Sequence, residues 1–497
     1  MAARRDDIVA ADRVQIAIEM MSAYRPRGRV TQLAETYQLS RQALYDIGTK
    51  GRDSLDQTLA PGPHGPPAKE GSVLVTKGRL QRSILTLSEA GVSQRDVTMC
   101  VEEMLDTPIS ASWVNSELSK LEAQAQQANH EMQPAKGETL SGDEIFSNNA
   151  PNLLVIGNES LYIYALTRQD ERDGETWGCV LLEMPETAQF ASDAGTGLAA
   201  GVKAAEVDRH QLDWDHLLRP MWGQATRLET QAYGALTKVE ERAAKVNKAH
   251  TTKRLEQHLA QWEKLAVAAE EKIDKLDDFC RIARQVDDCF AIIDLTTGKL
   301  TNAEANKACL QAQGQKMAAM SGRIYQKLAK HLQNWAAALF AYQEPLRHAL
   351  TPLIKQYGQP AIAALCRIWQ CEADAKRRRL ALPEKQKRQQ IWQQALDEAF
   401  ACLGDDLLWQ AWDALSTVLS KPWRGSMLAE CVNSLLRPIL DRRKHTDQGC
   451  LDLFRFLHNV RPFRRGKRAG HSPAQLAGVA LPDDPLSLLG LAPKVSS

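Results

Sequence analysis

The 497-residue chain lacks the features that would place it in several specialised classes of protein. No apolar run approaches the roughly 18 residues that a membrane-spanning helix requires, and residues 1–7 contain no apolar signal region. The ten cysteines are irregularly spaced without a CxxC pair, so neither a zinc site nor a disulfide scaffold is indicated. We therefore expect a cytoplasmic protein with reduced cysteines and no membrane partner.

The chain also has little net charge. Its 62 Lys and Arg residues nearly balance its 61 Asp and Glu residues, and the formal charge of +1 gives no overall attraction to nucleic acid. Any basic binding surface must therefore be local. A hydrophobic content of 44% and a charged content of 25% are ordinary for a globular protein. The length leaves room for about three domains of ordinary size.

Two acidic residues lie beside strand-like segments between positions 139 and 205. Asp143 lies where β-propensity begins, and two short apolar runs follow it. Asp193 lies at a strand-to-helix turn, before a segment rich in alanine. Carboxylates held on neighbouring strands repel each other unless a cation lies between them. The pattern therefore predicts a divalent-metal site for phosphoryl transfer, with oxygen ligands suited to Mg²⁺ or Mn²⁺.

Segments around these acids resemble a bacterial insertion-sequence transposase of the DDE type. The segments are DEIF at 143–146, RDGETW at 172–177 and SDAGTG at 192–197. The family places a third acid far downstream on a helix, usually a Glu followed three residues later by Asn, and Glu430 with Asn433 matches that pattern. Similar tails close many transposase and integrase catalytic domains: LDLFRFLHNVRP at 451–462 and HSPAQ at 471–475.

The resemblance implies a metal-dependent DNA transposase with a ribonuclease-H-like core. Asp143, Asp193 and Glu430 would hold two Mg²⁺ or Mn²⁺ ions, which activate a water or a 3′-hydroxyl and stabilise the leaving oxygen. The enzyme would cut transposon ends and join them to target DNA. Its expected partner is double-stranded DNA, at the terminal inverted repeats and the target, bound by a homodimer or higher oligomer in the nucleoid.

Two further residues follow the third acid on the same predicted helix. Asn433, one turn after Glu430, would orient Glu430 or the scissile phosphate. Arg437 lies on the same face at i+7, where it suits a phosphate contact.

Other acids compete for the three catalytic positions: Glu159, Asp208 and Asp213. The segment at 207–216 is similar to an Asp/His-rich segment that such transposases often carry after their second acid. Direct participation in catalysis or a purely structural use both remain open for three of its residues: His210, Asp213 and His216.

A long helical insertion is predicted between the second and third acids. Asp143 and Asp193 are 50 positions apart, but 237 positions separate Asp193 from Glu430, far more than a compact core needs. Residues 220–422 are rich in Ala, Gln, Lys, Glu and Leu, and 226–284 have the pattern of an antiparallel helical hairpin or coiled coil. This arrangement resembles that of hAT-type transposases.

Further helices are predicted in the insertion at 302–345, 347–379 and 384–418. We expect their tryptophans to be buried: Trp335, Trp369, Trp392, Trp409 and Trp412.

Residues 28–47 have the pattern of a DNA-binding helix-turn-helix. Ser40 is a suitable N-cap for the second helix, and Leu44 and Ile47 would face inward. Gln38 departs from the pattern, because a glycine is common at that turn. The outward residues expected to contact DNA bases or phosphates are Arg41, Gln42 and Tyr45. A plain three-helix bundle is the alternative.

A second helix-turn-helix pattern follows a Pro/Gly linker. Helices are predicted at 79–89, 94–105 and 110–128, with Ser93 and Ser110 as N-caps. The exposed candidates for DNA contact on the last helix are Ser112, Asn115 and Lys120. Trp113 is expected to belong to the core rather than to contact a base.

The most basic stretch of the chain is 437–468, which contains few acids. Such a concentration of charge next to a phosphodiester site would neutralise the DNA backbone. Three of its arginines are predicted to contact DNA: Arg461, Arg464 and Arg465.

The predicted fold class is multidomain and mainly α, with an α/β ribonuclease-H-like catalytic core, N-terminal helix-turn-helix units and a large helical insertion. The expected order is a helix-turn-helix domain at 1–58, a linker at 59–74, a second helical domain at 75–128, a linker at 129–138, the core at 139–219 and 423–480 around the insertion at 220–422, and a tail at 481–497. Two alternatives share these features: an inactive, domesticated transposase that binds DNA, and a ribonuclease-H-fold nuclease without strand transfer.

Overall fold

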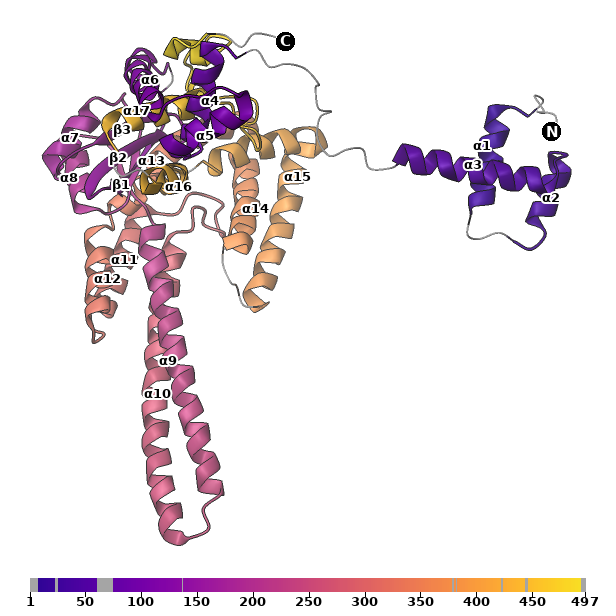
Figure 1. The fold of residues 1–497 in the computed structure, drawn as a ribbon. Coiled ribbons are helices and arrows are strands. Elements are labelled where there is room, and N and C mark those ends of the chain that lie inside the picture. The colour runs from indigo at the N-terminus through magenta and orange to yellow at the C-terminus, as the bar shows by residue number, and fades with distance from the viewer. Residues whose placement is uncertain are drawn as a thin grey trace. The chain divides into compact units, whose positions relative to one another are not determined.

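The computed structural model describes residues 8–22, 26–59, 75–135, 137–377, 380, 382–421, 423–442 and 446–492. The described chain is mainly helical with one mixed five-stranded sheet (Figure 1). It divides into two compact units, Met1–Leu74 and Val75–Ser497. Within the described ranges, no helix has the length and apolar character that crossing a membrane would demand. The predicted linker at 59–74 lies, except for Leu59, outside the described residues.

The first unit contains three described helices. They are α1 (Ala10–Met21), α2 (Arg29–Thr36) and α3 (Arg41–Leu59). Ile16, Met20, Leu33 and Leu44 form its buried core. Helices α1 and α3 cross closely because Gly48 carries no side chain; a Cβ there would lie 2.7 Å from the Met20 Cβ.

The turn between α2 and α3 agrees with the helix-turn-helix pattern in its local geometry. Gln38 adopts a φ of 49°, the left-handed conformation for which glycine is the usual residue. Ser40 accepts a hydrogen bond from the Ala43 N–H at 3.2 Å, as expected of an N-cap. Leu44 is buried and Ile47 is half-buried, so both face inward as predicted.

Helices α4 (Lys77–Glu89), α5 (Gln94–Leu105) and α6 (Ala111–Glu131) begin at side-chain caps, because Thr76, Ser93 and Ser110 each accept a backbone hydrogen bond. Trp113 is half-buried against their small core, as predicted. These helices belong to the same compact unit as the sheet, since the C-terminal half of α6 also packs into the core beside it.

The sheet has the strand order β3-β2-β1-β4-β5. Its strands are β1 (Leu140–Ser147), β2 (Ala150–Gly157), β3 (Ile163–Arg168), β4 (Phe190–Ser192) and β5 (His210–Leu212). The first three strands form an antiparallel meander, whereas β4 is parallel to β1 and β5 is parallel to β4. The connections to the parallel strands contain α7 (Gly174–Leu182) and α8 (Thr196–Ala204).

Helices cover both faces of the sheet. Leu153 and Val155 of β2 pack in the core formed with α6, α7 and α8. Leu154 and Ile156 face the opposite way, into the core formed with α16 (Met427–Arg442) and α17 (Gln448–Val460). Because successive strand residues point to opposite faces, burial of both faces explains the uninterrupted apolar run of this strand.

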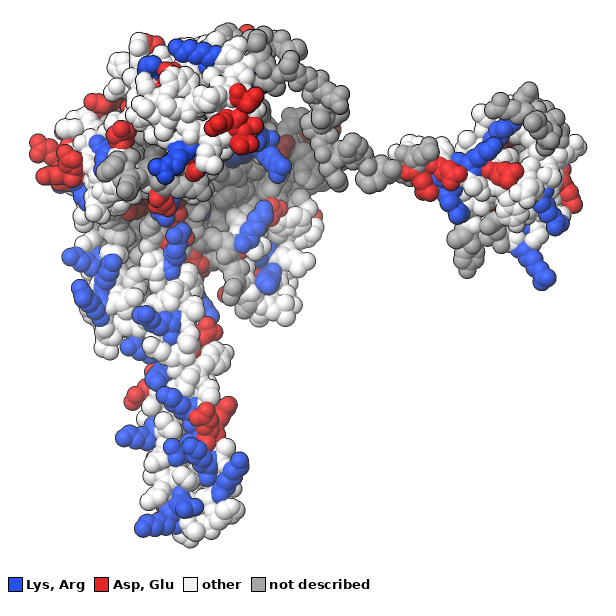
Figure 2. All heavy atoms as spheres, in the orientation of Figure 1, with Lys and Arg blue, Asp and Glu red and all other residues white. Residues whose placement is uncertain are grey.

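The insertion is helical in all its longer described elements, and it begins with the predicted hairpin. Helices α9 (Asp215–Asn247) and α10 (Thr252–Cys289) run side by side and extend away from the sheet (Figure 1). Figure 2 shows Lys and Arg side chains gathered at the free end of this hairpin. The other elements are α11 (Ala303–Ala318), α12 (Arg323–Asn334), η1 (Ala338–Phe340), α13 (Gln343–Tyr357), α14 (Gln359–Arg377) and α15 (Leu382–Leu419).

The prediction of continuous helices is wrong for two of the long segments in the insertion. The segment 302–345 is divided before α12, where Gly322 has a φ of 131°, and 347–379 is divided at Gly358, whose φ is 88°. Neither backbone conformation fits an α-helix, and glycine adopts both readily. A third glycine, Gly404 with φ 64°, kinks α15.

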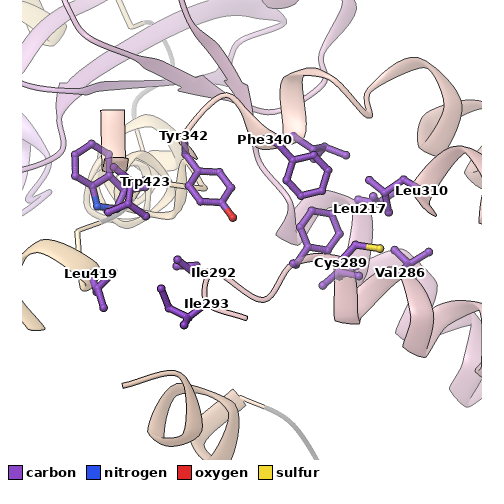
Figure 3. Packing of buried hydrophobic residues seen from close by; sticks show 14 of the residues in the cluster. Leu217, Val286, Cys289, Ile292, Ile293, Leu310, Phe340, Tyr342, Leu419 and Trp423 are labelled. Carbon is purple, nitrogen blue, oxygen red and sulfur yellow. The ribbon is translucent and has the colours of Figure 1, made fainter. Parts of the chain in front are cut away.

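The predicted burial of the five tryptophans is also wrong in degree. Trp335, Trp369, Trp392 and Trp412 are half-buried against the main core of the insertion, and Trp409 is 64% exposed. An indole ring is large enough that one edge commonly stays in water. The interior of this core holds a different tryptophan, Trp423, together with smaller rings and aliphatic side chains; Figure 3 shows Tyr342 beside Trp423, and Phe340 close to Leu217 and Cys289.

Candidate active site

Two of the predicted acids each come directly after one member of a residue pair that joins the adjacent parallel strands β1 and β4. Gly142 of β1 and Ser192 of β4 are paired in register, and the next residue after each is an acid, Asp143 and Asp193. A glycine is required at 142, because a Cβ there would lie 2.5 Å from the Phe190 ring. The sheet register therefore sets the two carboxylates side by side.

The third acid reaches them through α16. Glu430 lies in the first turn of this helix, and Asn433 lies one turn later. The Asn433 Nδ2 donates a hydrogen bond of 2.7 Å to the Asp143 Oδ2, and Asn433 is buried. The structure thus brings the predicted Glu-x-x-Asn pair against the predicted strand acids.

The three acids share one electrostatic environment. Burial raises the pKa of Asp143 to about 6; the hydrogen bond from Asn433 opposes this rise, and the negative charges of Asp193 and Glu430 add to it. Each ionised carboxylate therefore raises the cost of ionising the next, which is the situation that a bound cation relieves.

A further acid links β1 to α7 and to the residues just before it. Glu144, next to Asp143, accepts a hydrogen bond of 2.7 Å from the Trp177 Nε1 and lies 3.3 Å from the Arg172 Nη2. Arg172 and Trp177 are the ends of the motif segment 172–177. Two of the three short motifs are thus in contact in the folded chain.

Two cationic groups approach Glu430. The His216 Nε2 lies 3.4 Å from the Glu430 Oε1, and the Arg219 Nη2 lies 3.9 Å from the Glu430 Oε2. The Asp213 carboxylate, whose Oδ2 lies 3.3 Å from the His216 Nδ1, raises the pKa of His216 to about 8, although burial opposes the rise. At neutral pH an imidazolium and a guanidinium therefore offset part of the negative charge of the site.

Asp213 joins the end of β5 to the start of α16. It is buried and accepts hydrogen bonds from the Ser426 N–H at 2.9 Å, the Ser426 Oγ at 3.0 Å and the Asp215 N–H at 2.8 Å. Its Oδ2 also lies 3.3 Å from the His216 Nδ1. Burial alone would raise the pKa of Asp213, but the nearby His216 ring and the hydrogen bonds from the Ser426 and Asp215 N–H groups lower it overall.

The other residues of the Asp/His-rich segment have different surroundings. The His210 Nε2 lies 2.8 Å from the Ser192 Oγ, and burial lowers the pKa of His210 to about 4, so its ring is neutral at pH 7. Asp208 is exposed. Glu159, in the β2–β3 turn, pairs with Lys421 at 2.6 Å. None of these contacts places Glu159, Asp208 or His210 against Glu430.

The donor chemistry of the site fits a divalent cation, although its geometry is not that of a loaded site. Within the described ranges, no three His, Cys, Asp or Glu side chains form a ready metal-binding group. Glu430 contacts His216 and Arg219 instead. Asp143, Asp193 and Glu430 supply carboxylate oxygens, and the buried Asn433 Oδ1 has no hydrogen-bond partner among the described residues. Such oxygens are the ligands that Mg²⁺ and Mn²⁺ prefer.

The predicted DNA contacts on the two helix-turn-helix patterns are exposed. On α3, Arg41 donates to the Thr31 Oγ1 at 3.0 Å and Gln42 to the Asp46 Oδ1 at 3.0 Å, and Tyr45 is 49% exposed.

On α6 the predicted residues Ser112, Asn115 and Lys120 are exposed as well. Asn115 accepts a hydrogen bond from Gln94 at 2.8 Å, and Lys120 pairs with Glu117 at 2.7 Å.

The predicted arginines of the C-terminal basic stretch are distributed over several elements. Arg437 is exposed on α16, and Arg461 forms an ion pair with Glu89 of α4. Arg464 and Arg465 are exposed in the loop after α17. That loop is held at the β2–β3 turn by Arg468, which donates to the Asn158 and Glu159 carbonyls.

Asn158 shows which end of β1 this basic loop occupies. Its backbone N–H bonds to the carbonyl of Thr139, four residues before Asp143. At about 3.3 Å per strand residue, the loop lies about 13 Å along the strand from the acid. Arg461, Arg464 and Arg465 were expected to lie directly beside the carboxylates. The structure does not place their positive charges there.

Sequence reasoning missed Arg219 and Ser426. Ser426 precedes the first residue of α16, and a serine at that position is a recognisable sign of a helix start. No local sign marks Arg219, because its contact with Glu430 depends on how α9 leaves the sheet.

A groove begins beside the site. It has a volume of about 1200 Å³ and is lined by the start of α9, the second half of α10 and the start of α15. Arg219 lies in its wall together with Trp214 and Trp222. The Glu430 side chain, which Arg219 approaches, is 35% exposed.

Comparison of the chain with models of known protein families and with curated proteins found no match. What the site does must therefore be inferred from its own geometry and charge.

Proposed function

We propose that the protein is a DDE transposase, which binds transposon ends and catalyses metal-dependent DNA strand cleavage and strand transfer. The observation that carries this proposal is the 2.7 Å hydrogen bond from Asn433 to Asp143. It joins residues 290 positions apart and seats the helix of Glu430 against the strands of Asp143 and Asp193. A chance set of surface carboxylates would not converge in the order that the family pattern requires.

The fold supports the same proposal. An antiparallel meander continued by two parallel strands, with helices on both faces, is consistent with a ribonuclease-H-like core. The strand carrying Asp143 is central in this sheet and pairs with the strand that precedes Asp193. The helical segment between β5 and α16 corresponds to the proposed insertion.

The carboxylates of Asp143, Asp193 and Glu430 would hold two Mg²⁺ or Mn²⁺ ions. When bound, these ions lower the pKa of a water or a 3′-hydroxyl and stabilise the leaving oxygen. Asn433 keeps the Asp143 carboxylate in one orientation. His216 and Arg219 hold Glu430 near the strand acids and limit the repulsion among the three.

Exposed residues supply the DNA contacts in this proposal. Arg41, Gln42 and Tyr45 would contact one DNA groove, and Ser112, Asn115 and Lys120 would contact a second segment. Arg437 would contact a phosphate near Glu430. A homodimer or higher oligomer on the transposon ends is part of the same proposal.

The test is a strand-transfer assay on duplex DNA that carries the inverted repeats flanking the gene, with Mg²⁺ and target DNA. Stabilisation by metal ions amounts to several kcal/mol, and each 1.36 kcal/mol is a factor of ten in rate. Asp193→Ala, Asp143→Asn and Glu430→Gln should therefore each lower the rate on the order of 1,000-fold or more. Asp208→Asn, which changes an exposed acid of the same region, should leave the rate unchanged.

The products separate the alternatives. Cleavage without joining would identify a nuclease of this fold. Binding without cleavage would identify a domesticated DNA-binding protein. Full activity of the Asp193→Ala protein would reject the proposed site.

A further inference from the structure

The distal half of the α9–α10 hairpin contributes little to the core of the protein. The last buried residue of α9 is Ala235, and the first buried residue of α10 is Ala269. The described residues between these positions are exposed or half-buried. Extension of the hairpin beyond the core therefore adds reach rather than stability.

The end of the hairpin is strongly basic. We define the basic tip as residues 242–255, which contain five cations and no Asp or Glu: Arg242, Lys245, Lys248, Lys253 and Arg254. Four of them are exposed. Arg242 is half-buried, and its Nη1 lies 3.2 Å from the His258 Nδ1. In a chain with a net charge of +1, this is a local excess, and Figure 2 shows it at the free end of the hairpin.

Helix stabilisation explains only part of this charge. Lys245, in the last turn of α9, complements the negative end of that helix dipole. Lys253 and Arg254 lie in the first turn of α10, where the dipole disfavours cations and where no acid is present. The remainder of the hairpin differs, because its cations alternate with acids such as Glu240, Glu263 and Glu271.

We propose that the basic tip binds the phosphodiester backbone of duplex DNA, at a second site remote from the catalytic carboxylates; this inference rests on the proposed function. Helix α9 ends at Asn247, and at 1.5 Å per residue it carries the tip about 42 Å from Arg219 near its start. That distance corresponds to about 12 base pairs at 3.4 Å each. Exposed lysine and arginine side chains suit phosphates, which supply most of the sequence-independent attraction of DNA for a protein.

The experiment compares binding of a fluorescent 40-base-pair duplex by the full-length protein at 50, 100 and 200 mM KCl. The tip variant changes Lys245, Lys248, Lys253 and Arg254 to Gln. The matched control changes four exposed cations nearer the body of the same hairpin to Gln: Arg227, Lys238, Lys264 and Lys272. Both variants lose the same charge by the same chemistry, and circular dichroism checks that both keep the helix content of the parent.

The tip variant should bind on the order of tenfold or more weakly at 100 mM KCl. The slope of its affinity against salt concentration, on logarithmic scales, should fall by roughly 0.9 for each phosphate that the variant no longer neutralises. The control should keep the slope of the parent, and a variant with Arg at positions 245, 248 and 253 should keep both affinity and slope.

Equal losses of affinity in the tip variant and the control would show a general charge effect and overturn the inference. Normal binding by the tip variant would overturn it while leaving the proposed function standing, and a parent that binds no DNA would overturn both. Sedimentation of the parent and the tip variant tests whether the tip binds a second copy of the chain instead of DNA. In that case the tip variant would dissociate from an oligomer, and its DNA affinity per protomer would be unchanged.

Discussion

Asp143, a candidate catalytic carboxylate, is buried in a way that works against the stability of the fold. It lies on a central strand, accepts one hydrogen bond from a buried amide, and has two other acids near it. Burial raises its pKa from 3.8 to about 6, so the folded protein binds a proton there more tightly than the unfolded chain does. The stability that this proton contributes is fully present below pH 3.8 and is lost as the pH rises through about 6.

Asp143→Asn should therefore stabilise the protein in metal-free buffer at pH 7.5. A pKa difference of roughly two units, at about 1.36 kcal/mol each, sets an upper limit near 3 kcal/mol, and we expect on the order of 1–3 kcal/mol. Urea unfolding at pH 4, 6 and 7.5 measures the gain, which should vanish near pH 4. The exposed Asp208→Asn is the control. A variant that is less stable than the parent at pH 7.5 would show that the buried charge is already compensated.

At the same scale, local sequence identified the acids but not their neighbours. Asp143, Asp193, Glu430 and Asn433 were singled out because their segments resemble those of DDE transposases. The contact of Arg219 with Glu430 was not, since a surface arginine on a helix has no local sign of its partner.

The elements of secondary structure follow local rules where caps mark their ends. Helix α5 begins and ends where the sequence predicts, because Ser93 caps its start and Asp106, with a φ of 47°, ends it in the left-handed conformation. The long insertion helices were predicted as continuous because a single glycine in a helical pattern is tolerated. Whether it interrupts the helix depends on the backbone conformation that packing imposes, as at Gly322 and Gly358.

Alanine substitutions at two helical glycines should change stability in opposite directions. Gly48 in α3 lies against α1, where a Cβ would approach the Met20 Cβ to 2.7 Å, whereas a Cβ at Gly234 in α9 meets nothing within 4 Å. Alanine favours a helix over glycine by about 0.5–1 kcal/mol. Gly234→Ala should thus slow hydrogen exchange in α9, and Gly48→Ala should speed it in α1 and α3 through a loss of about 1–3 kcal/mol.

Exchange measured by mass spectrometry on the full-length protein reports both regions at once. If hydrogen exchange in α1 and α3 of the Gly48→Ala protein is as slow as in the parent, the crossing of these helices can widen without loss of stability.

For the whole molecule, the decisive feature is how residues far apart in sequence hold the third acid in place. Asp213 at the end of β5 binds Ser426 at the start of α16, 213 positions later. Gln189, just before β4, donates to the Trp423 carbonyl at 2.6 Å, and the Arg424 side chain lies 4.6 Å from the Trp214 ring centroid. The insertion leaves and returns through this region, so its length does not move Glu430 from the strand acids.

Removal of the Asp213 carboxylate should loosen this attachment. Asp213→Ala leaves the buried Ser426 N–H and Oγ without their acceptor, and each unsatisfied buried group costs about 1–3 kcal/mol. We expect a destabilisation of about 2 kcal/mol or more in urea unfolding, together with faster hydrogen exchange in α16. Asp208→Ala, at an exposed acid five positions earlier, should change neither. Unchanged exchange in α16 would mean that helix packing alone seats Glu430.

The sequence by itself determined the helix caps, the strand segments and the helical hairpin. These depend on propensities and periodicities that act over a few residues, whereas the candidate acids and the Glu-x-x-Asn pair were singled out by the resemblance of their segments to a transposase family. Only the tertiary structure decided that Asn433 contacts Asp143, that His216 and Arg219 face Glu430, and that the arginines after α17 lie at the other end of β1. Such contacts join segments through packing and sheet register, and neither can be computed from the local pattern of the residues involved.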